Sequence, residues 1–145
     1  MNVNYINPVL ESLVNVLGTM AQLTARPGKP SIKQEQSAQG DVTGIMSMFG
    51  PEARGSIAIT FTAPVILELA RRMLHEVYPS VNGMVIDLVG EITNMVTGGA
   101  KGLLEEQGHK FDMSLPTMVA GPDHDDFITA CGQSQEFRKT RLCLE

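Results

Sequence analysis

The stretch LVGEITNMVTGGAKGLLEEQ, residues 88–107, decides how the fold is interpreted. Its apolar residues recur every three or four positions, which predicts an amphipathic helix. We expect this helix, the longest in the chain, to run from about Val81 to Gln107, with Gly108 as its C-terminal stop. Its broad apolar face is formed by Val85, Leu88, Val89, Ile92, Met95, Val96 and Leu103.

A narrow line of mostly polar residues, called the polar row below, lies beside this apolar face. Residues three or four apart share one face of a helix, so Glu91, Asn94 and Gly98 are consecutive neighbours in it. Because Gly98 has no side chain, it leaves a dent beside an amide and a carboxylate that could receive part of a partner. The alternative is a solvated face, the default for a polar stripe. The full row is Asp87, Glu91, Asn94, Gly98, Lys101 and Glu105.

Four glycines lie inside the expected helix beyond its first turn: Gly90, Gly98, Gly99 and Gly102. Each interior glycine costs about 0.5–1 kcal/mol relative to alanine. The helix must therefore be held by tertiary contacts. Gly99 and Gly102 lie toward the apolar side of the helical wheel, where we expect them to allow tight internal packing.

Other segments extend outward from this helix in both directions. The order helix, strands, helix, helix, strands predicts an α+β domain with a largely antiparallel sheet and helices packed against it. The expected elements are a helix from Asn7 and Pro8 to about Leu23, a short strand and turn within 31–39, a β-prone stretch over 42–49, a hairpin loop at 50–55, a strand over 56–61, a helix over 63–77, and strands over 110–120, 127–132 and 137–144.

The first helix weakly resembles the long one. Residues 13–21, LVNVLGTMA, are similar to residues 92–100, ITNMVTGGA, with Asn15 aligned to Asn94 and Ser12 standing where Glu91 stands. This similarity indicates a duplicated unit of one helix plus strands. If the first copy was once a site, it has lost the carboxylate.

Length and charge exclude several classes of protein. The chain has 145 residues and a formal net charge of −5, which fits one domain or two small repeats with a shared core and argues against nucleic-acid binding. No apolar run is long enough to span a membrane, and the N-terminus lacks the pattern of a signal peptide. We therefore expect a cytoplasmic protein with Cys131 and Cys143 reduced.

Candidate metal ligands and nucleophiles are weak in this sequence. His75, His109 and His124 are scattered without the spacing of a zinc site. His124-Asp125-Asp126 is more typical of a solvated loop. The glycine-rich segment 97–102 lies within a helix and is no phosphate-binding loop. We expect no metal site in this chain.

Glu91 and Asn94, followed 22 positions later by Pro116, match the Glu-x2-Asn-x(21–22)-Pro signature of the CheC/CheX/FliY family of bacterial chemotaxis phosphatases. The chain resembles this family from Asn7 to its C-terminus. The segments 26–30, 40–44, 88–101 and 111–117 resemble CheX-type members in particular. The resemblance implies a CheC-like fold of tandem helix-plus-strands repeats, here a single domain over 1–145 with a degenerate first repeat at about 7–62 and an active second repeat at about 81–145.

Members of this family remove phosphate from the phosphorylated response regulator CheY. The resemblance implies that the Asn94 amide orients the attacking water and that Glu91 contacts a lysine in the active site of the regulator. Pro116 would shape the chain near the helix, and Asp87, Gly98 and Lys101 would contact the partner. Mg²⁺ would belong to the receiver, so no cofactor of its own is expected. The resemblance also implies a homodimer.

Two other functions stay open at this point. A non-catalytic receiver-binding or flagellar-motor switch module could use the same fold, since a fold does not fix an activity. A small-ligand domain with Gly98 at the floor of a pocket is less favoured, because nothing in the polar row suits an apolar ligand.

Overall fold

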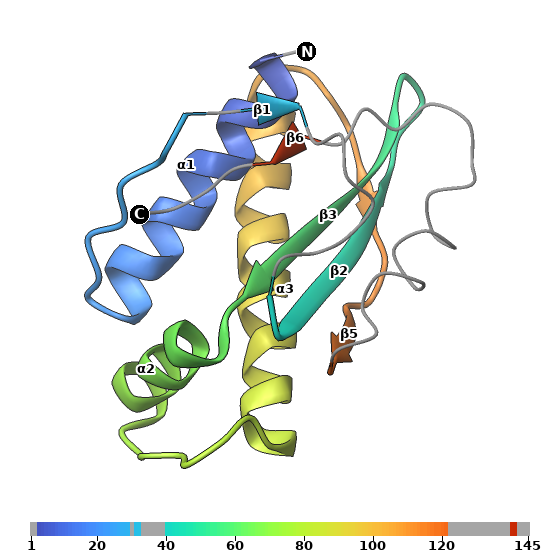
Figure 1. The fold of residues 1–145 in the computed structure, drawn as a ribbon. Helices are drawn as coiled ribbons and strands as arrows, with labels where there is room; N and C mark the ends of the chain where they lie inside the picture. The colour runs from blue at the N-terminus through green and yellow to red at the C-terminus, as the bar shows by residue number, and fades with distance from the viewer. Residues whose placement is uncertain (1–2, 30, 33–39, 122–139, 142–145) are drawn as a thin grey trace.

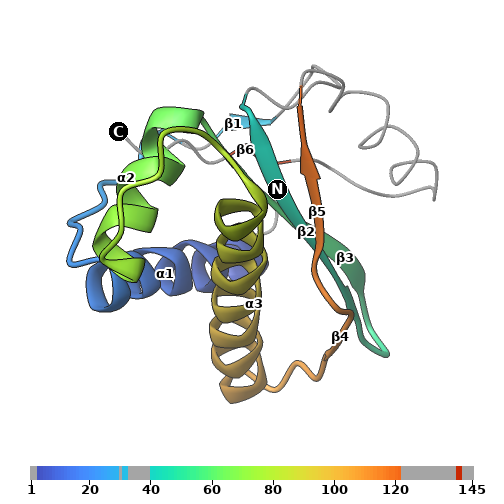
Figure 2. The same cartoon turned by 90° about the horizontal axis from the view of Figure 1, so that it is seen from below.

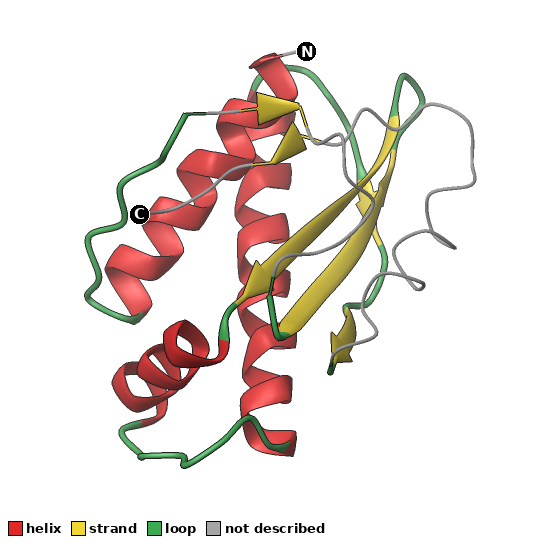
Figure 3. Cartoon of the chain, in the orientation of Figure 1, coloured by secondary structure: helices red, strands yellow, loops and turns green. Residues whose placement is uncertain are grey.

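The elements occur in the order that the sequence predicts. The computed structural model describes residues 3–29, 31–32, 40–121 and 140–141. Figures 1 and 3 show the arrangement of its elements: α1 (Val3–Met20), β1 (Ser31–Ile32), β2 (Val42–Phe49), β3 (Arg54–Phe61), α2 (Ala63–Leu74), α3 (Gly83–Glu106), β4 (Asp112–Met113), β5 (Thr117–Ala120) and β6 (Thr140–Arg141).

Strand β2 is the centre of an antiparallel sheet. It pairs with β3 along its whole length, from Val42 opposite Phe61 to Phe49 opposite Arg54, and its other edge pairs with β4 and then β5. A second, two-stranded pair joins β1 to β6, also antiparallel. Figure 2 shows the three helices on one side of the larger sheet. The α+β architecture with an antiparallel sheet is thus confirmed.

The main core forms where the helices meet this sheet. The apolar face of α3 is buried at Val85, Leu88, Val89, Ile92 and Val96 as expected, whereas Met95 and Leu103 at its margins are half-buried. These side chains pack with others from α1, α2, β2 and β3, among them Leu13, Leu17, Val42, Phe61, Ile66 and Leu69. Burying an apolar side chain of this size contributes about 1.5–3 kcal/mol. In the described residues, no helix is both long enough and apolar enough to cross a membrane.

Three helix boundaries differ from the prediction by three residues or more, and one of them is the end of α1, at Met20 and not near Leu23. Helix α1 begins at Val3, so Pro8 is not its first residue but lies inside it. Proline lacks an N–H and removes one backbone hydrogen bond, and this loss is tolerated here close to the start of the helix. Helix α2 ends at Leu74 and not near Val77, because His75 adopts a left-handed conformation with φ of 56°.

The strand expected over 110–120 is two short strands. β4 and β5 are separated by residues 114–116, where the Ser114 N–H donates to the Ser47 carbonyl and the Ser47 N–H donates to Ser114 Oγ. Pro116 has no N–H to give to a sheet ladder, which favours a break here. The strand expected over 127–132 lies outside the described residues, and of 137–144 only β6 is described. The two-repeat division stays a prediction.

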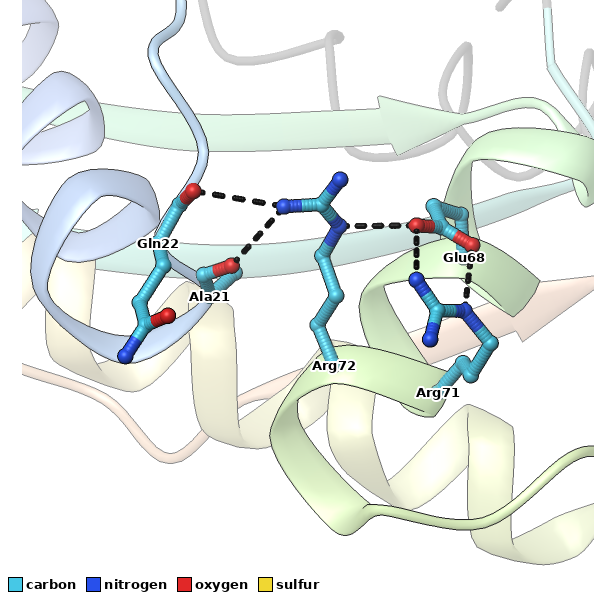
Figure 4. A network of polar contacts seen from close by, with 5 residues as sticks. All are labelled: Ala21, Gln22, Glu68, Arg71 and Arg72. Carbon is cyan, nitrogen blue, oxygen red and sulfur yellow. Dashed lines mark hydrogen bonds and ion pairs between the residues drawn. The ribbon is translucent and has the colours of Figure 1, made fainter.

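Arg72 links α2 to the end of α1 (Figure 4). Its Nη1 donates to the carbonyls of Ala21 and Gln22, at 3.4 and 3.2 Å, and its Nε donates to Glu68 Oε1 at 2.7 Å. Glu68 also accepts two hydrogen bonds from Arg71, at 2.9 and 2.8 Å. The hydrogen bonds from Arg71 and Arg72 lower the pKa of Glu68 from 4.5 to about 2.

We expect the pairing of Glu68 with Arg71 and Arg72 to make the stability of the fold depend on pH in the acidic range. A carboxylate with a lowered folded-state pKa stabilises the fold fully above its unfolded pKa of 4.5, and this contribution is lost as the pH falls through about 2. Because the side chains are partly exposed, the effect should be modest and weaker in high salt. The unfolding temperatures of wild type and Glu68→Gln, followed from neutral pH to about pH 2, should converge in this window. The exposed Glu106→Gln should show no such convergence, and parallel curves for Glu68→Gln would contradict the prediction.

Candidate functional site

Helix α3, which carries the polar row, is capped at its start and packed against the core along one face. At its start the side chain of Asn82 accepts a hydrogen bond from the Val85 N–H at 3.1 Å, which satisfies one free donor of the first turn. At its end Gly108 has φ of 91°, a conformation suited to glycine, so the predicted stop is confirmed. A helix capped at its start and buried along one face holds the spacing of the side chains on its other face.

The polar row lies on the exposed side of α3. Asp87, Glu91 and Asn94 are exposed, whereas Gly98 and Lys101 are partly buried. Glu91 and Asn94 are three residues apart, so they project from the same face about 4.5 Å apart along the helix axis. The structure therefore brings the two candidate catalytic side chains together and leaves both open to a macromolecular partner.

Two packed elements border the row. On one side α1 contacts α3, where Ser12 Oγ donates to the Val96 carbonyl at 2.7 Å and also lies against Gly99. On the other side Met118 of β5 lies over Gly90, so that a Cβ there would be 2.7 Å from its sulfur. Both glycines therefore permit close packing. For Gly99 this was the prediction, and it is confirmed.

Gly98 and Gly102, the other two of the four glycines considered above, face open space. A Cβ added at Gly98 would meet no atom of the described residues within 4 Å, apart from those of its own turn, and the same holds at Gly102. Position 98 is thus open, one turn from Asn94, while a dent that receives a partner stays a prediction. The prediction that Gly102 packs internally is wrong, because α1 contacts the helix at Gly99 and does not reach around to Gly102.

Charges along the row are of both signs. Lys101 Nζ lies 3.6 Å from Glu105 Oε1, an ion pair of the i, i+4 type on a partly exposed surface. Asp87 and Glu91 carry acidic groups toward the other end of the row. Lys101 is thus the basic side chain of the polar row, and a partly exposed ion pair of this kind contributes little to stability.

Pro116 lies half-buried between β4 and β5. Figures 1 and 2 both show β4 and β5 running back along α3, and Met118 contacts Gly90. Pro116 thus comes two residues before Met118, the residue that lies over Gly90.

The first helix does not repeat this arrangement. Ser12, which aligns with Glu91, is buried in the contact with α3, whereas Asn15, which aligns with Asn94, is exposed. Asn15 lines an open hollow of about 410 Å³ between α1 and residues 22–25. The position equivalent to Glu91 is therefore not presented outward beside Asn15.

The remaining candidates are separate from the polar row. His109 Nδ1 lies 3.1 Å from Glu52 Oε2, and its ring stacks obliquely on Tyr5, with centroids 5.2 Å apart. His75 is exposed at the end of α2. His124, Cys131 and Cys143 lie outside the described residues. Within the described ranges, no three His, Cys, Asp or Glu side chains are grouped as metal ligands.

Comparison with known proteins gives consistent results. A family model described as "Chemotaxis phosphatase CheX" matches residues 42–137. A solved CheC-like superfamily protein from Shewanella sp. PV-4 is 52% identical, with a TM-score of 0.81 over 86% of this chain and 80% of that one.

Two more distant relatives carry names that concern function. The CheY-P phosphatase CheX of Thermotoga maritima is 23% identical over 85% of this chain and 79% of its own length. The CheX–CheY–BeF3–Mg²⁺ complex from Borrelia burgdorferi contains a chain 23% identical, with a TM-score of 0.74 over 99% of this chain and 91% of that one. At this identity the second likeness shows the shared fold.

Proposed function

The chain belongs to the chemotaxis phosphatase CheX family, and on that premise we propose that it hydrolyses the aspartyl phosphate of a phosphorylated CheY-like response regulator. The observation that carries the proposal is the exposed pair of Glu91 and Asn94 on one face of α3, whose opposite face is buried in the core. A phosphorylated domain can reach this pair directly. The name of the Thermotoga maritima relative supports the same reaction.

In the proposed mechanism Asn94 positions the attacking water. Phosphoryl transfer requires an in-line nucleophile and little covalent chemistry from the protein. A carboxamide offers both a donor and an acceptor, so it can hold a water in one orientation. It is not a strong base, and its contribution to the rate must come from positioning. The exposed position of Asn94 supports this role, since the water must lie between two proteins.

Glu91 is proposed to bind the regulator one turn away. Its carboxylate is exposed and would pair with a lysine of the receiver. Such a pair fixes the register of docking, and it places Asn94 over the phosphorylated aspartate. In this proposal Glu91 orients the receiver and Asn94 orients the attacking water.

The surroundings of the pair are assigned to partner contact. Asp87 extends the row toward the start of α3, Gly98 leaves room for the receiver, and Lys101 can turn from Glu105 toward an anionic group. Mg²⁺ is expected on the receiver, as the composition of the Borrelia burgdorferi complex suggests. We also propose that the protein is a cytoplasmic homodimer, as the family resemblance implies.

The direct test is phosphate release. A CheY-type receiver from the same organism, phosphorylated and supplied with Mg²⁺, should lose its phosphate faster with the chain than without it. Equal rates with and without the chain, at concentrations where the two proteins bind, would instead favour a non-catalytic receiver-binding module.

Filling the dent should obstruct docking. We expect Gly98→Leu to reduce receiver dephosphorylation at least about tenfold, since a leucine side chain would stand beside Asn94 on the face that the receiver must approach. The fold should be retained, because the position is open and leucine favours helix over glycine. Steady-state phosphate release and thermal unfolding measure the two effects.

The matched control for this variant is Gly18→Leu. Gly18 also lies in a helix with open space around it, where an added Cβ would be 4.0 Å from the Leu23 carbonyl oxygen, but it belongs to α1. It should leave the rate unchanged. Normal turnover by Gly98→Leu would show that the dent has no role in docking.

A further inference from the structure

Met84 is an exposed apolar side chain on the same face as the polar row. It precedes Asp87 by three residues and Glu91 by seven, so the spacing of the row continues through it toward the start of α3. Its side chain is 56% exposed, although most other apolar residues in the first half of α3 are buried or half-buried. Sequence reasoning missed Met84 because it considered only the polar positions of that face.

The fold itself gives Met84 no packing role. It belongs to neither of the apolar clusters formed by the described residues. The start of α3 is held by Asn82, whose side chain caps Val85, and the neighbouring Gly83 faces open space. What distinguishes Met84 is its position, because it continues the row that carries Asp87 and Glu91.

The negative charge of this face favours local contacts, and an apolar contact is one that like charges do not weaken. The chain has a net charge of −5, and the half of the row next to Met84 carries Asp87 and Glu91. A phosphorylated carboxylate pocket is also anionic, so the long-range field opposes docking and affinity has to come from local contacts. Buried apolar anchors supply most of the affinity in many protein interfaces, and methionine adapts well to irregular partner surfaces.

We propose that Met84 is the apolar anchor for the phosphorylated receiver, packing on an apolar rim beside its phosphorylation site. Seven helical residues separate Met84 from Glu91 by about 10.5 Å along the axis, so it would contact the rim and not the phosphoryl group. The inference rests on the proposed function for its partner. It adds a residue that determines affinity without taking part in the hydrolysis.

Binding and turnover should therefore respond differently to Met84→Ala. The probe is a CheY-type receiver from the same organism, loaded with beryllofluoride and Mg²⁺. We expect its Kd to rise about fivefold to tenfold, which is about 1–1.4 kcal/mol, as for an anchor that loses its buried side chain. In steady-state phosphate release KM should rise with little change in kcat. Met84→Leu should bind about as well as wild type, because it keeps the apolar volume.

Met20→Ala is the matched control. Met20 is 49% exposed at the end of α1, which makes it similar in residue type and exposure but places it off the row. Its variant should bind the loaded receiver as wild type does. Unchanged affinity in Met84→Ala, or an equal loss in both alanine variants, would overturn the proposal.

The binding assay also separates the two proposals. If wild type binds the loaded receiver but releases no phosphate from the phosphorylated one, the proposed phosphatase activity fails, while a weaker Kd for Met84→Ala still supports the anchor. If wild type hydrolyses normally and Met84→Ala binds normally, the anchor alone is overturned.

Discussion

Replacement of Asn94 by alanine is expected to lower the rate of receiver dephosphorylation about 100-fold or more while the protein remains folded. The carboxamide is proposed to hold the attacking water, and a methyl group can neither donate to that water nor accept from it. When the attacking water is no longer held in position, the chemical step of hydrolysis becomes slower. The decrease should therefore appear in kcat and much less in KM.

The structure predicts no penalty in stability for this change. Asn94 is exposed to solvent and lies far from both ends of α3. At such a position alanine has a higher helix propensity than asparagine. The unfolding temperature should equal or slightly exceed that of wild type. A loss of rate at full stability would assign the effect to the amide and not to the fold.

The matched control is Asn15→Ala. Asn15 aligns with Asn94 in the similarity between the two helices, and it is also exposed in a helix, but its partner position Ser12 is buried against α3. We expect wild-type rates from this variant. Unchanged turnover in Asn94→Ala would remove Asn94 from the mechanism, and a large loss in Asn15→Ala would point to a second site on α1.

The long helix and its polar row could be predicted because both depend on local periodicity. A repeat of 3.6 residues fixes which side chains share a face, whatever the helix packs against. The burial of Ile92 and Val96 and the exposure of Glu91 and Asn94 follow from the same pattern. The candidate site was therefore accessible from one segment of sequence.

Helical periodicity does not predict which glycines of α3 are in contact with other elements. A helical wheel places Gly99 and Gly102 toward the same side, yet Ser12 approaches only Gly99. Which of the two is in contact depends on where α1 crosses α3, and the sequence of α3 does not contain that information. The same limit applies to Gly90, because its neighbour Met118 belongs to β5, which follows α3 in the sequence.

Hydrogen bonds between residues far apart in the chain could likewise not be predicted from the sequence. Thr62 is the N-cap residue of α2 but makes no capping bond with its side chain, whereas Asp41 Oδ2 accepts from the Ala63 N–H at 2.6 Å. Asp41 precedes α2 by more than twenty residues and reaches it because β2 and β3 pair. Such a cap becomes visible only with the tertiary structure.

Gly44→Ala is expected to destabilise the protein by about 2 kcal/mol or more, the second large effect that the structure predicts. Gly44 is the third residue of β2 and lies where α3 packs on the sheet. A Cβ at this position would overlap Thr93 Oγ1 and would lie 3.0 Å from Thr93 Cβ and 3.2 Å from Val89 Cγ1. Thr93 is fully buried, and its hydroxyl donates to the Val89 carbonyl at 2.7 Å, so it has little freedom to move away.

Thermal or denaturant unfolding measures this effect, and a shift of about 5 °C or more in the unfolding temperature is expected. Gly102→Ala is the control, because it also adds one methyl group but does so in open space within a helix. It should be neutral or stabilising by about 0.5–1 kcal/mol. Equal unfolding temperatures for Gly44→Ala and wild type would mean that α3 is not seated on β2 as closely as the structure describes.

The same variant connects the fold to the site. Met118 pairs with Gly44 across the sheet and lies over Gly90, so the sheet contacts α3 at Thr93 and Val89 through Gly44 and at Gly90 through Met118. These contacts surround the turns that carry Glu91 and Asn94. If Gly44→Ala displaces the helix, the loss in stability should be accompanied by weaker receiver binding even where the protein is still folded. Retention of full affinity in the folded variant would show that the polar row does not depend on how the helix is seated.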